Sequence, residues 1–185
     1  DGLCTALEAD LAGIGEPEQT ALDRHPDGTR MEYWTRDTRY ALAMRTFAHE
    51  DTVPFDEMTR RTTVRLRYLR NKLLTDLAEG NKIFVYRNMF RNLEEVELNR
   101  LHAAVRRYGD NVLLYIKFED SAHPNGTVEW AQPGLMVAYI DHFSNSPTDE
   151  PLGDAFPSYL TICRSAFRMW TENRSTSLGT PAPSH

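Results

Sequence analysis

The clearest pattern of apolar and polar positions along the chain lies in residues 55–79. Its apolar or small residues recur at spacings of three and four, at Met58, Thr62, Leu66, Leu69, Leu73 and Leu77. Because one turn of an α-helix takes between three and four residues, this spacing predicts a long helix with one buried stripe. Pro54 suits the first turn of that helix, and Gly80 suits its C-terminal end.

Two short and nearly continuous apolar runs, 82–87 and 111–118, flank a second helical pattern at 92–108. Such runs are typical of strands that are buried on both faces of a parallel sheet. The order of strand, helix and strand therefore predicts a βαβ unit with parallel strands and a right-handed crossover. A further apolar run at 134–140 is expected to add another strand.

The N-terminal part and the last helix have weaker patterns. Residues 31–36 alternate in polarity and residues 40–48 follow after a short polar turn, which predicts an antiparallel hairpin. Leucines four residues apart predict a helix at 2–12, and the polar, turn-rich residues 16–30 predict a loop. Apolar residues on one side of 157–169 predict a final helix.

These elements together predict an α/β fold with a mixed, partly parallel sheet flanked by helices. The strands expected in this sheet are 31–36, 40–48, 82–87, 111–118 and 134–140. We expect residues 1–170 to form a single domain, from which an N-terminal segment can be missing because the chain opens at Asp1 directly in a helical pattern. Residues 171–185 are rich in Ser, Thr and Pro and are expected to form a disordered tail.

Composition and charge narrow the functional classes. The 185 residues are 41% apolar and carry a formal net charge of −6, so we expect a globular protein that does not bind nucleic acid. The basic residues crowded into 60–72 favour a solvated helix face over a patch that contacts an anionic ligand. No apolar run approaches the roughly 20 residues of a membrane span. Cys4 and Cys163 lie among apolar residues, which favours two buried thiols in a reducing cytoplasm over one long-range disulfide.

Candidate catalytic residues follow the expected strands, because ligands gather beyond the C-terminal ends of strands in open α/β sheets. His49 is followed directly by two carboxylates, Glu50 and Asp51, and such an imidazole can act as a general base. The alternative is a half-exposed histidine that makes a hydrogen bond within its loop. Asp141, which follows strand 134–140, and Asp120, which follows strand 111–118, are the candidates for orienting His49.

Candidate binding residues occupy the same strand ends. Arg87 and Asn88 follow a buried strand, where they can hold an anion or a sugar or simply solvate the strand end. His123, with Glu119 and Asp120, offers nitrogen and oxygen ligands for a divalent ion, but no HExxH or HxH motif supports a metal site and we predict none. No glycine-rich loop follows a strand, so we also expect no nucleotide cofactor.

Four segments occur in an order that resembles one bacterial domain family. They read Tyr-Ala-Leu-Ala-Met-Arg-Thr-Phe-Ala-His-Glu-Asp (40–51), Arg-Leu-Arg-Tyr-Leu-Arg-Asn-Lys-Leu-Leu-Thr-Asp-Leu (65–77), Gly-Asn-Lys-Ile-Phe-Val-Tyr-Arg-Asn (80–88) and Glu-Leu-Asn-Arg-Leu-His-Ala-Ala-Val-Arg-Arg-Tyr-Gly-Asp-Asn-Val-Leu-Leu-Tyr-Ile (97–116). The family is described as papain-like cysteine peptidases, and its members often accompany glycosyltransferases or cell-surface polysaccharide genes. The similarity covers most of residues 1–170.

The resemblance implies a nucleophilic cysteine in a Ser-Leu-Gly-x-x-Cys segment near the start of the domain. That segment is absent here, and neither Cys4 nor Cys163 matches it. His49 falls where the family has a histidine followed by an acidic residue, and a thiol nucleophile needs such a neighbouring base. The resemblance therefore implies a cysteine-peptidase-like hydrolase with His49 as base, which is inactive as this fragment and whose substrate would be a protein or a glycan.

Two other functions stay open at the level of the sequence. The absent nucleophile favours a non-catalytic module that binds a protein or glycan partner beside a polysaccharide enzyme. The carboxylates at the strand ends permit a metal-assisted enzyme of the sugar-phosphate type.

Overall fold

The chain divides into two compact units. The computed structural model describes residues 2–88, 90–143 and 153–178. Unit 1 contains residues 1–80 and 103–109, and unit 2 contains residues 81–102 and 110–185. Within the described residues, no helix is both long and apolar enough to cross a membrane.

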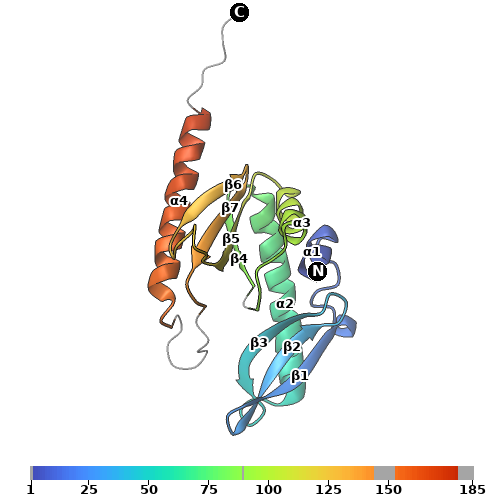
Figure 1. Ribbon diagram of the computed structural model, residues 1–185. Coiled ribbons are helices and arrows are strands. Elements are labelled where there is room, and N and C mark those ends of the chain that lie inside the picture. The colour runs from blue at the N-terminus through green and yellow to red at the C-terminus, as the bar shows by residue number, and fades with distance from the viewer. Residues whose placement is uncertain (1, 89, 144–152, 179–185) are drawn as a thin grey trace, which may run out of the picture. The chain divides into compact units, whose positions relative to one another are not determined.

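Unit 1 combines a three-stranded antiparallel sheet with one long helix (Figure 1). The strand order is β1-β2-β3, so β2 is the central strand. The elements are α1 (Gly2–Glu8), the short 3-10 helix η1 (Pro17–Gln19), β1 (Thr20–Asp27), β2 (Arg30–Asp37), β3 (Leu42–His49) and α2 (Phe55–Ala78).

Strand β1 corrects the prediction of a loop at 16–30. Every residue of β1 pairs with β2, and Gly28, with a φ of +60°, lies in the tight turn that joins them. The prediction was wrong because β1 is an edge strand whose polar side chains interact across the sheet, as Asp23 does with Arg36. Pro26 is tolerated in β1 because an edge strand has backbone positions that pair with no neighbour.

The hairpin predicted for 31–36 and 40–48 is confirmed as β2 and β3, which are antiparallel. Strand β3 begins at Leu42 because the preceding residues form the turn. There, the backbone N–H of Tyr40 donates to Oδ1 of Asp37 over 2.7 Å.

Helix α2 confirms the helix predicted at 55–79, with Met58 and Leu77 buried. Helix α1 ends earlier than the predicted residue 12. Asp10 and Leu11 have φ values of +53° and +55°, which lie outside the right-handed helical region and stop the helix.

Unit 2 contains a four-stranded mixed sheet with the order β4-β5-β7-β6. Strands β4, β5 and β7 are parallel, and β6 pairs antiparallel with β7. The elements are β4 (Ile83–Arg87), α3 (Glu95–Arg106), which ends in unit 1, β5 (Val112–Phe118), β6 (Val128–Gln132), β7 (Leu135–Ile140) and α4 (Phe156–Leu178).

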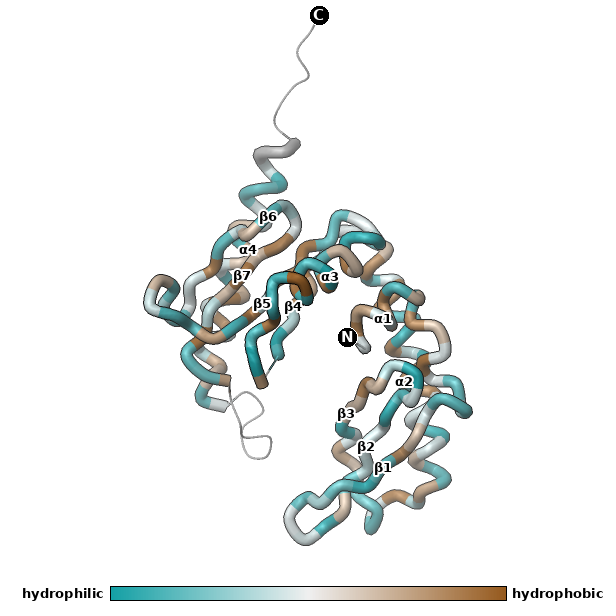
Figure 2. Tube along the Cα trace, turned by 45° about the vertical axis from the view of Figure 1, so that its right-hand side comes forward, coloured by the Kyte–Doolittle hydropathy of each residue, from teal (hydrophilic) through white to brown (hydrophobic). Residues whose placement is uncertain are grey.

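The predicted order of strand, helix and strand and the parallel pairing are confirmed, because β4 and β5 are parallel and α3 lies between them in the chain. All six residues of β7 are buried, and Figure 2 shows this strand as hydrophobic along much of its length. One core cluster joins β5 and β7 to α4 through Val112, Leu114, Ile116, Met136, Ala138, Ile140, Phe143, Ala155, Ile162 and Ala166.

Helix α4 corrects part of the prediction for the C-terminal tail. The helix runs to Leu178, so residues 171–178 are helical, whereas 179–185 lie outside the described residues. The hydroxyls of Thr171 and Ser175 donate to backbone carbonyls four residues earlier, which accommodates these polar residues inside a helix. A sequence rich in Ser and Thr therefore does not end the helix.

The α/β fold class is confirmed, and the predicted strands are divided between two sheets. Strands 31–36 and 40–48 belong to the antiparallel sheet of unit 1, and the other three belong to the mixed sheet of unit 2. Strand β6 was not predicted, because it is short and only partly buried and its alternation is weak.

Candidate functional site

His49 is held by a carboxylate that the sequence did not indicate. It ends β3, its side chain is 17% exposed, and its Nε2 lies 2.9 Å from Oδ2 of Asp27 at the end of β1. The hydrogen bond from His49 lowers the pKa of Asp27, and the nearby positive charge of Arg45 lowers it further. Asp27 was missed because it fell in the predicted loop. In acid–base catalysis a carboxylate in this position orients the imidazole, which acts as the base.

A buried carboxylate beside this pair is bound by several donors. Glu32 on β2 is 1% exposed and accepts hydrogen bonds from Arg45 Nε at 2.8 Å and from the Phe47 N–H at 2.8 Å. The indole of Trp34 also donates to it, over 3.3 Å. Burial alone would raise the pKa of Glu32, but these donors hold it below the ordinary value of 4.5. Glu32 is therefore a structural anion that ties β2 to β3.

In unit 2, Asp120 and His123 form a contact of their own. His123 Nδ1 lies 2.7 Å from Asp120 Oδ1, and its ring stacks on Tyr139 with the centroids 4.3 Å apart. The hydrogen bond from His123 lowers the pKa of Asp120. The structure thus brings together Asp120, a candidate catalytic residue, and His123, a candidate binding residue.

Asp141 lies beside the histidine that follows it in the chain. His142 Nδ1 is 3.0 Å from Asp141 Oδ1, and His142 Nε2 is 3.2 Å from Asp154 Oδ1. The nearby carboxylates of Asp141 and then of Asp154 raise the pKa of His142 above the ordinary 6.5. This imidazole therefore gains positive charge more readily than a free histidine.

Arg87 and Asn88 take part in local packing. Arg87 donates a hydrogen bond to the hydroxyl of Tyr159, and its guanidinium lies 5.4 Å from the ring centroid of Phe143. Asn88 Oδ1 accepts the N–H of Phe90 over 2.9 Å. These contacts support the open alternative that both residues serve the end of the strand.

The predicted catalytic residues are split between the two units. His49 belongs to unit 1, whereas Asp120 and Asp141 belong to unit 2, so their proposed role toward His49 stays a prediction. Ligands gather beyond the C-terminal ends of strands in open α/β sheets, but this expectation does not apply to His49, because β3 belongs to an antiparallel sheet. Across the residues that the structure describes, no group of three or more His, Cys, Asp or Glu side chains could hold a metal ion.

The two cysteines lie on helices. Cys4 is half-buried in α1, and Cys163 lies on α4. Although Cys163 as a residue is exposed, partial burial of its sulfur raises the pKa of its thiol. This shift disfavours the thiolate form that a nucleophile needs.

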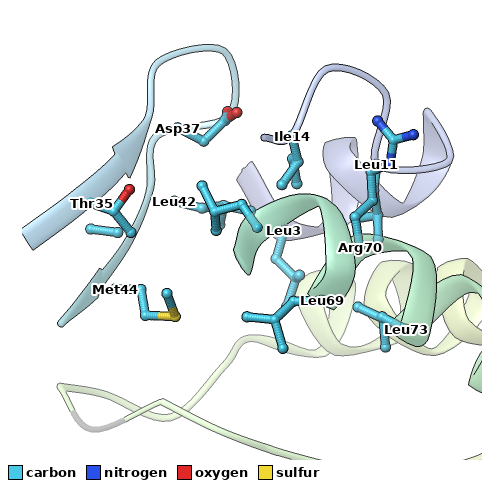
Figure 3. Close-up of a pocket in the computed structure, with 12 residues that line it drawn as sticks. Leu3, Leu11, Ile14, Thr35, Asp37, Leu42, Met44, Leu69, Arg70 and Leu73 are labelled. Carbon is cyan, nitrogen blue, oxygen red and sulfur yellow. The ribbon is translucent and has the colours of Figure 1, made fainter. Parts of the chain in front are cut away.

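A cavity of about 280 Å³ lies within unit 1, and sequence reasoning did not find it (Figure 3). One wall is a face of the sheet, where Thr35 pairs with Met44 and Asp37 pairs with Leu42. The remaining walls come from α2 and from the N-terminal segment. They consist of Leu66, Leu69, Arg70 and Leu73 on α2, with Leu3, Leu11 and Ile14.

Three polar atoms that belong to residues lining this cavity are buried and have no hydrogen-bond partner among the described residues. They are Thr35 Oγ1, Asp37 Oδ2 and Arg70 Nε. Thr35 is 2% exposed and Asp37 is 4% exposed. The surface that the cavity presents is almost wholly apolar, so these three atoms are closed off from it.

The apolar stripe of α2, which predicted a buried helix face, could have located one wall of the cavity, but not the opposite wall.

Comparison with protein families, with curated proteins and with solved structures finds no match to this chain.

Proposed function

We propose that this protein is a non-catalytic binding module that holds a small, largely apolar molecule in the cavity of unit 1. The observation that carries the proposal is a cavity of about 280 Å³ whose walls are rich in leucine. Binding sites for small molecules are concave and mostly apolar, with a few polar groups that fix the orientation of the ligand. The concave shape and the apolar walls of the cavity match this description.

The chemistry of the walls favours an apolar ligand over the glycan considered at the level of the sequence. A saccharide carries hydroxyl groups around its whole surface. Leu66, Leu69 and Leu73 offer these hydroxyls no side-chain hydrogen bond. Each buried hydroxyl without a partner costs about 1–3 kcal/mol, so the sugar would lose more on leaving water than it gained.

Filling the cavity should abolish binding without unfolding the protein. We expect Leu73→Phe, which places a larger side chain at the cavity wall, to prevent binding of indole and hexanol. The matched control is Leu74→Phe, at the next residue on α2, which does not line the cavity. Binding is measured by the NMR shift of the Met44 methyl group, with the buried Met58 as an internal reference.

The proposal requires both probes to shift the Met44 methyl signal in the wild type and in Leu74→Phe. It also requires the shift to vanish in Leu73→Phe while the melting temperature is retained. Unchanged Met44 signals in the wild type would refute it.

A hydrolase with His49 as base is the second candidate, favoured by the hydrogen bond between His49 and Asp27. If it is correct, His49→Ala should lower the hydrolysis of fluorogenic peptides by about 100-fold or more, the usual contribution of a general base. Asp27→Asn should have a smaller effect in the same direction, because it removes only the orienting carboxylate. The control is Glu50→Gln, at an exposed residue. Equal rates in His49→Ala and the control would exclude this candidate.

A further inference from the structure

We propose that the outer edge of β4 binds an extended peptide strand of a partner protein, and that this peptide carries an acidic side chain. The edge belongs to unit 2, whereas the cavity belongs to unit 1, so the proposal does not depend on the proposed binding function. Three features of β4 carry it. They are its unused backbone groups, an edge that nothing in its own sequence protects, and an arginine at its end.

The backbone of β4 has unused hydrogen-bonding groups along its outer edge. β4 comes first in the order β4-β5-β7-β6, so β5 is its neighbour in the sheet (Figure 1). The carbonyl of Lys82 accepts the N–H of Val112 over 2.9 Å, so the backbone groups of Lys82 point toward β5. Because this direction alternates along a strand, the backbone groups of Ile83, Val85 and Arg87 point away from β5. Among the described residues, none forms a hydrogen bond with these outward groups.

The other edge strands of the two described sheets carry features that hinder pairing with a further strand. β1 contains Pro26, which has no N–H to donate. The register of β3 on β2 shifts, and Phe47 in β3 has a φ of +58°. The register of β6 on β7 also shifts. Proline and bulges protect exposed strand edges, but β4 contains no proline and all five of its residues pair with β5 in one register.

The central side chain of β4 is exposed on the same face of the sheet that carries α4. Val85 is paired with Leu114, which packs in the core cluster of α4. Helix α4, however, packs mainly on β6 and β7, the two strands farthest from β4. Val85 is therefore 54% exposed. An added strand would cover it best with an apolar side chain, because directly opposite residues of neighbouring strands contact each other.

Arg87, at the end of β4, indicates the charge of the peptide. Its guanidinium donates a hydrogen bond to the hydroxyl of Tyr159 and lies 5.4 Å from the ring centroid of Phe143. Within the part of the chain that the structure describes, it has no carboxylate partner. A carboxylate is the acceptor that a guanidinium binds best. Since Arg87 follows Val85 by two residues, the added strand should carry an acidic residue two positions from its apolar one.

Charge favours such a peptide over a second copy of this chain. In an antiparallel pair of two β4 strands centred on Val85, Arg87 of each copy would lie opposite Ile83 of the other. This position offers no carboxylate. Pairing of two copies would therefore leave both arginines without an acidic partner.

Three blocked heptapeptides test the proposal by titration followed through the amide NMR signals of the protein. Thr-Asp-Thr-Val-Thr-Thr-Thr places its acid opposite Arg87 in an antiparallel strand, and Thr-Thr-Thr-Val-Thr-Asp-Thr does so in a parallel strand. The third peptide has Lys in place of the Asp of whichever acidic peptide binds more tightly. We expect one acidic peptide to shift the amide signals of Ile83, Val85 and Arg87, and to bind at least about threefold more tightly than the Lys peptide.

Hydrogen exchange distinguishes strand pairing from a looser contact. With the acidic peptide at about ten times its dissociation constant, exchange of the Val85 N–H should slow about tenfold, because it then exchanges only from the free protein. The N–H of Gly28, an exposed residue in the turn between β1 and β2, should keep its exchange rate.

Variants assign the contacts. Val85→Pro removes the central outward N–H, which an edge strand tolerates, and should weaken binding of the acidic peptide at least about tenfold. Arg87→Gln should abolish the difference between the acidic and the Lys peptide. The control Arg164→Gln, at an exposed residue of α4, should preserve that difference. Melting temperatures verify folding, and Arg87→Gln decides the matter if Val85→Pro does not fold.

The proposal is overturned if neither acidic peptide shifts these amide signals at a concentration of several millimolar, or if the acidic and Lys peptides bind equally. Folded Val85→Pro that binds as the wild type does would also overturn it. A dimer of the wild type in sedimentation equilibrium that Val85→Pro dissociates would overturn it in favour of pairing between two copies.

Discussion

Replacing Glu32 with alanine should lower the free energy of unfolding by about 3–5 kcal/mol, the cost of breaking a buried ion pair by removing one partner. Glu32 is 1% exposed, and its loss would leave the donors on Arg45 and Phe47 without their acceptor. The effect is measured by urea denaturation followed by circular dichroism. The control is Glu50→Ala, which removes an ion pair with Arg24 whose two side chains are about half exposed.

The control should change the free energy of unfolding by less than about 1 kcal/mol, as is usual for exposed ion pairs. If Glu32→Ala changed it as little as the control does, Glu32 would not tie β2 to β3.

The same carboxylate should contribute to acid unfolding. Its pKa in the folded protein lies below the ordinary 4.5, so the folded state favours the ionised form. The stability that this shift contributes is complete above pH 4.5 and is lost as the pH falls through the lowered pKa. Glu32→Gln has no such group, so its melting temperature should fall less steeply with acid than that of the wild type.

Ile162→Ala should lower the free energy of unfolding of unit 2 by about 2–5 kcal/mol. Ile162 is 0% exposed and joins α4 to the core cluster of β5 and β7. Removing its side chain loses apolar burial and leaves a cavity that close-packed neighbours fill only in part. Trp130 and Trp170 pack against the same cluster, so their fluorescence reports unfolding during denaturation.

The matched control for this prediction is Arg164→Ala, two residues further along α4 and exposed. It should change the free energy of unfolding by less than about 0.5 kcal/mol. A change below 1 kcal/mol in Ile162→Ala would show that α4 is not held on the sheet through this residue.

Local patterns of polarity predicted the elements whose buried residues recur at a regular spacing. The leucine stripe of α2 and the apolar run of β5 were recognised because the buried residues of each element follow a regular pattern within one short segment. Strand β1 was missed because its polar side chains, such as Asp23, are matched by partners on the neighbouring strand. The end of α4 was missed because hydroxyl-to-carbonyl bonds inside the helix do not show in composition.

The candidate sites also contain parts that the sequence indicated and parts that it did not. His49 could be singled out from its neighbours in the sequence, but its hydrogen bond to Asp27 could not, because 22 residues separate the two along the chain. The cavity was beyond sequence reasoning for the same reason. Its walls come from the sheet, from α2 and from the N-terminal segment, which meet only when the chain has packed.

The amino-acid sequence by itself therefore determined the α/β class, the long helix α2 and the parallel βαβ unit, since these follow from periodicity within single segments. Only the tertiary structure decided the division into two sheets, the partner of His49 and the apolar cavity of unit 1. Strand register and helix packing bring distant residues together, and short-range patterns of polarity do not encode which distant residues meet.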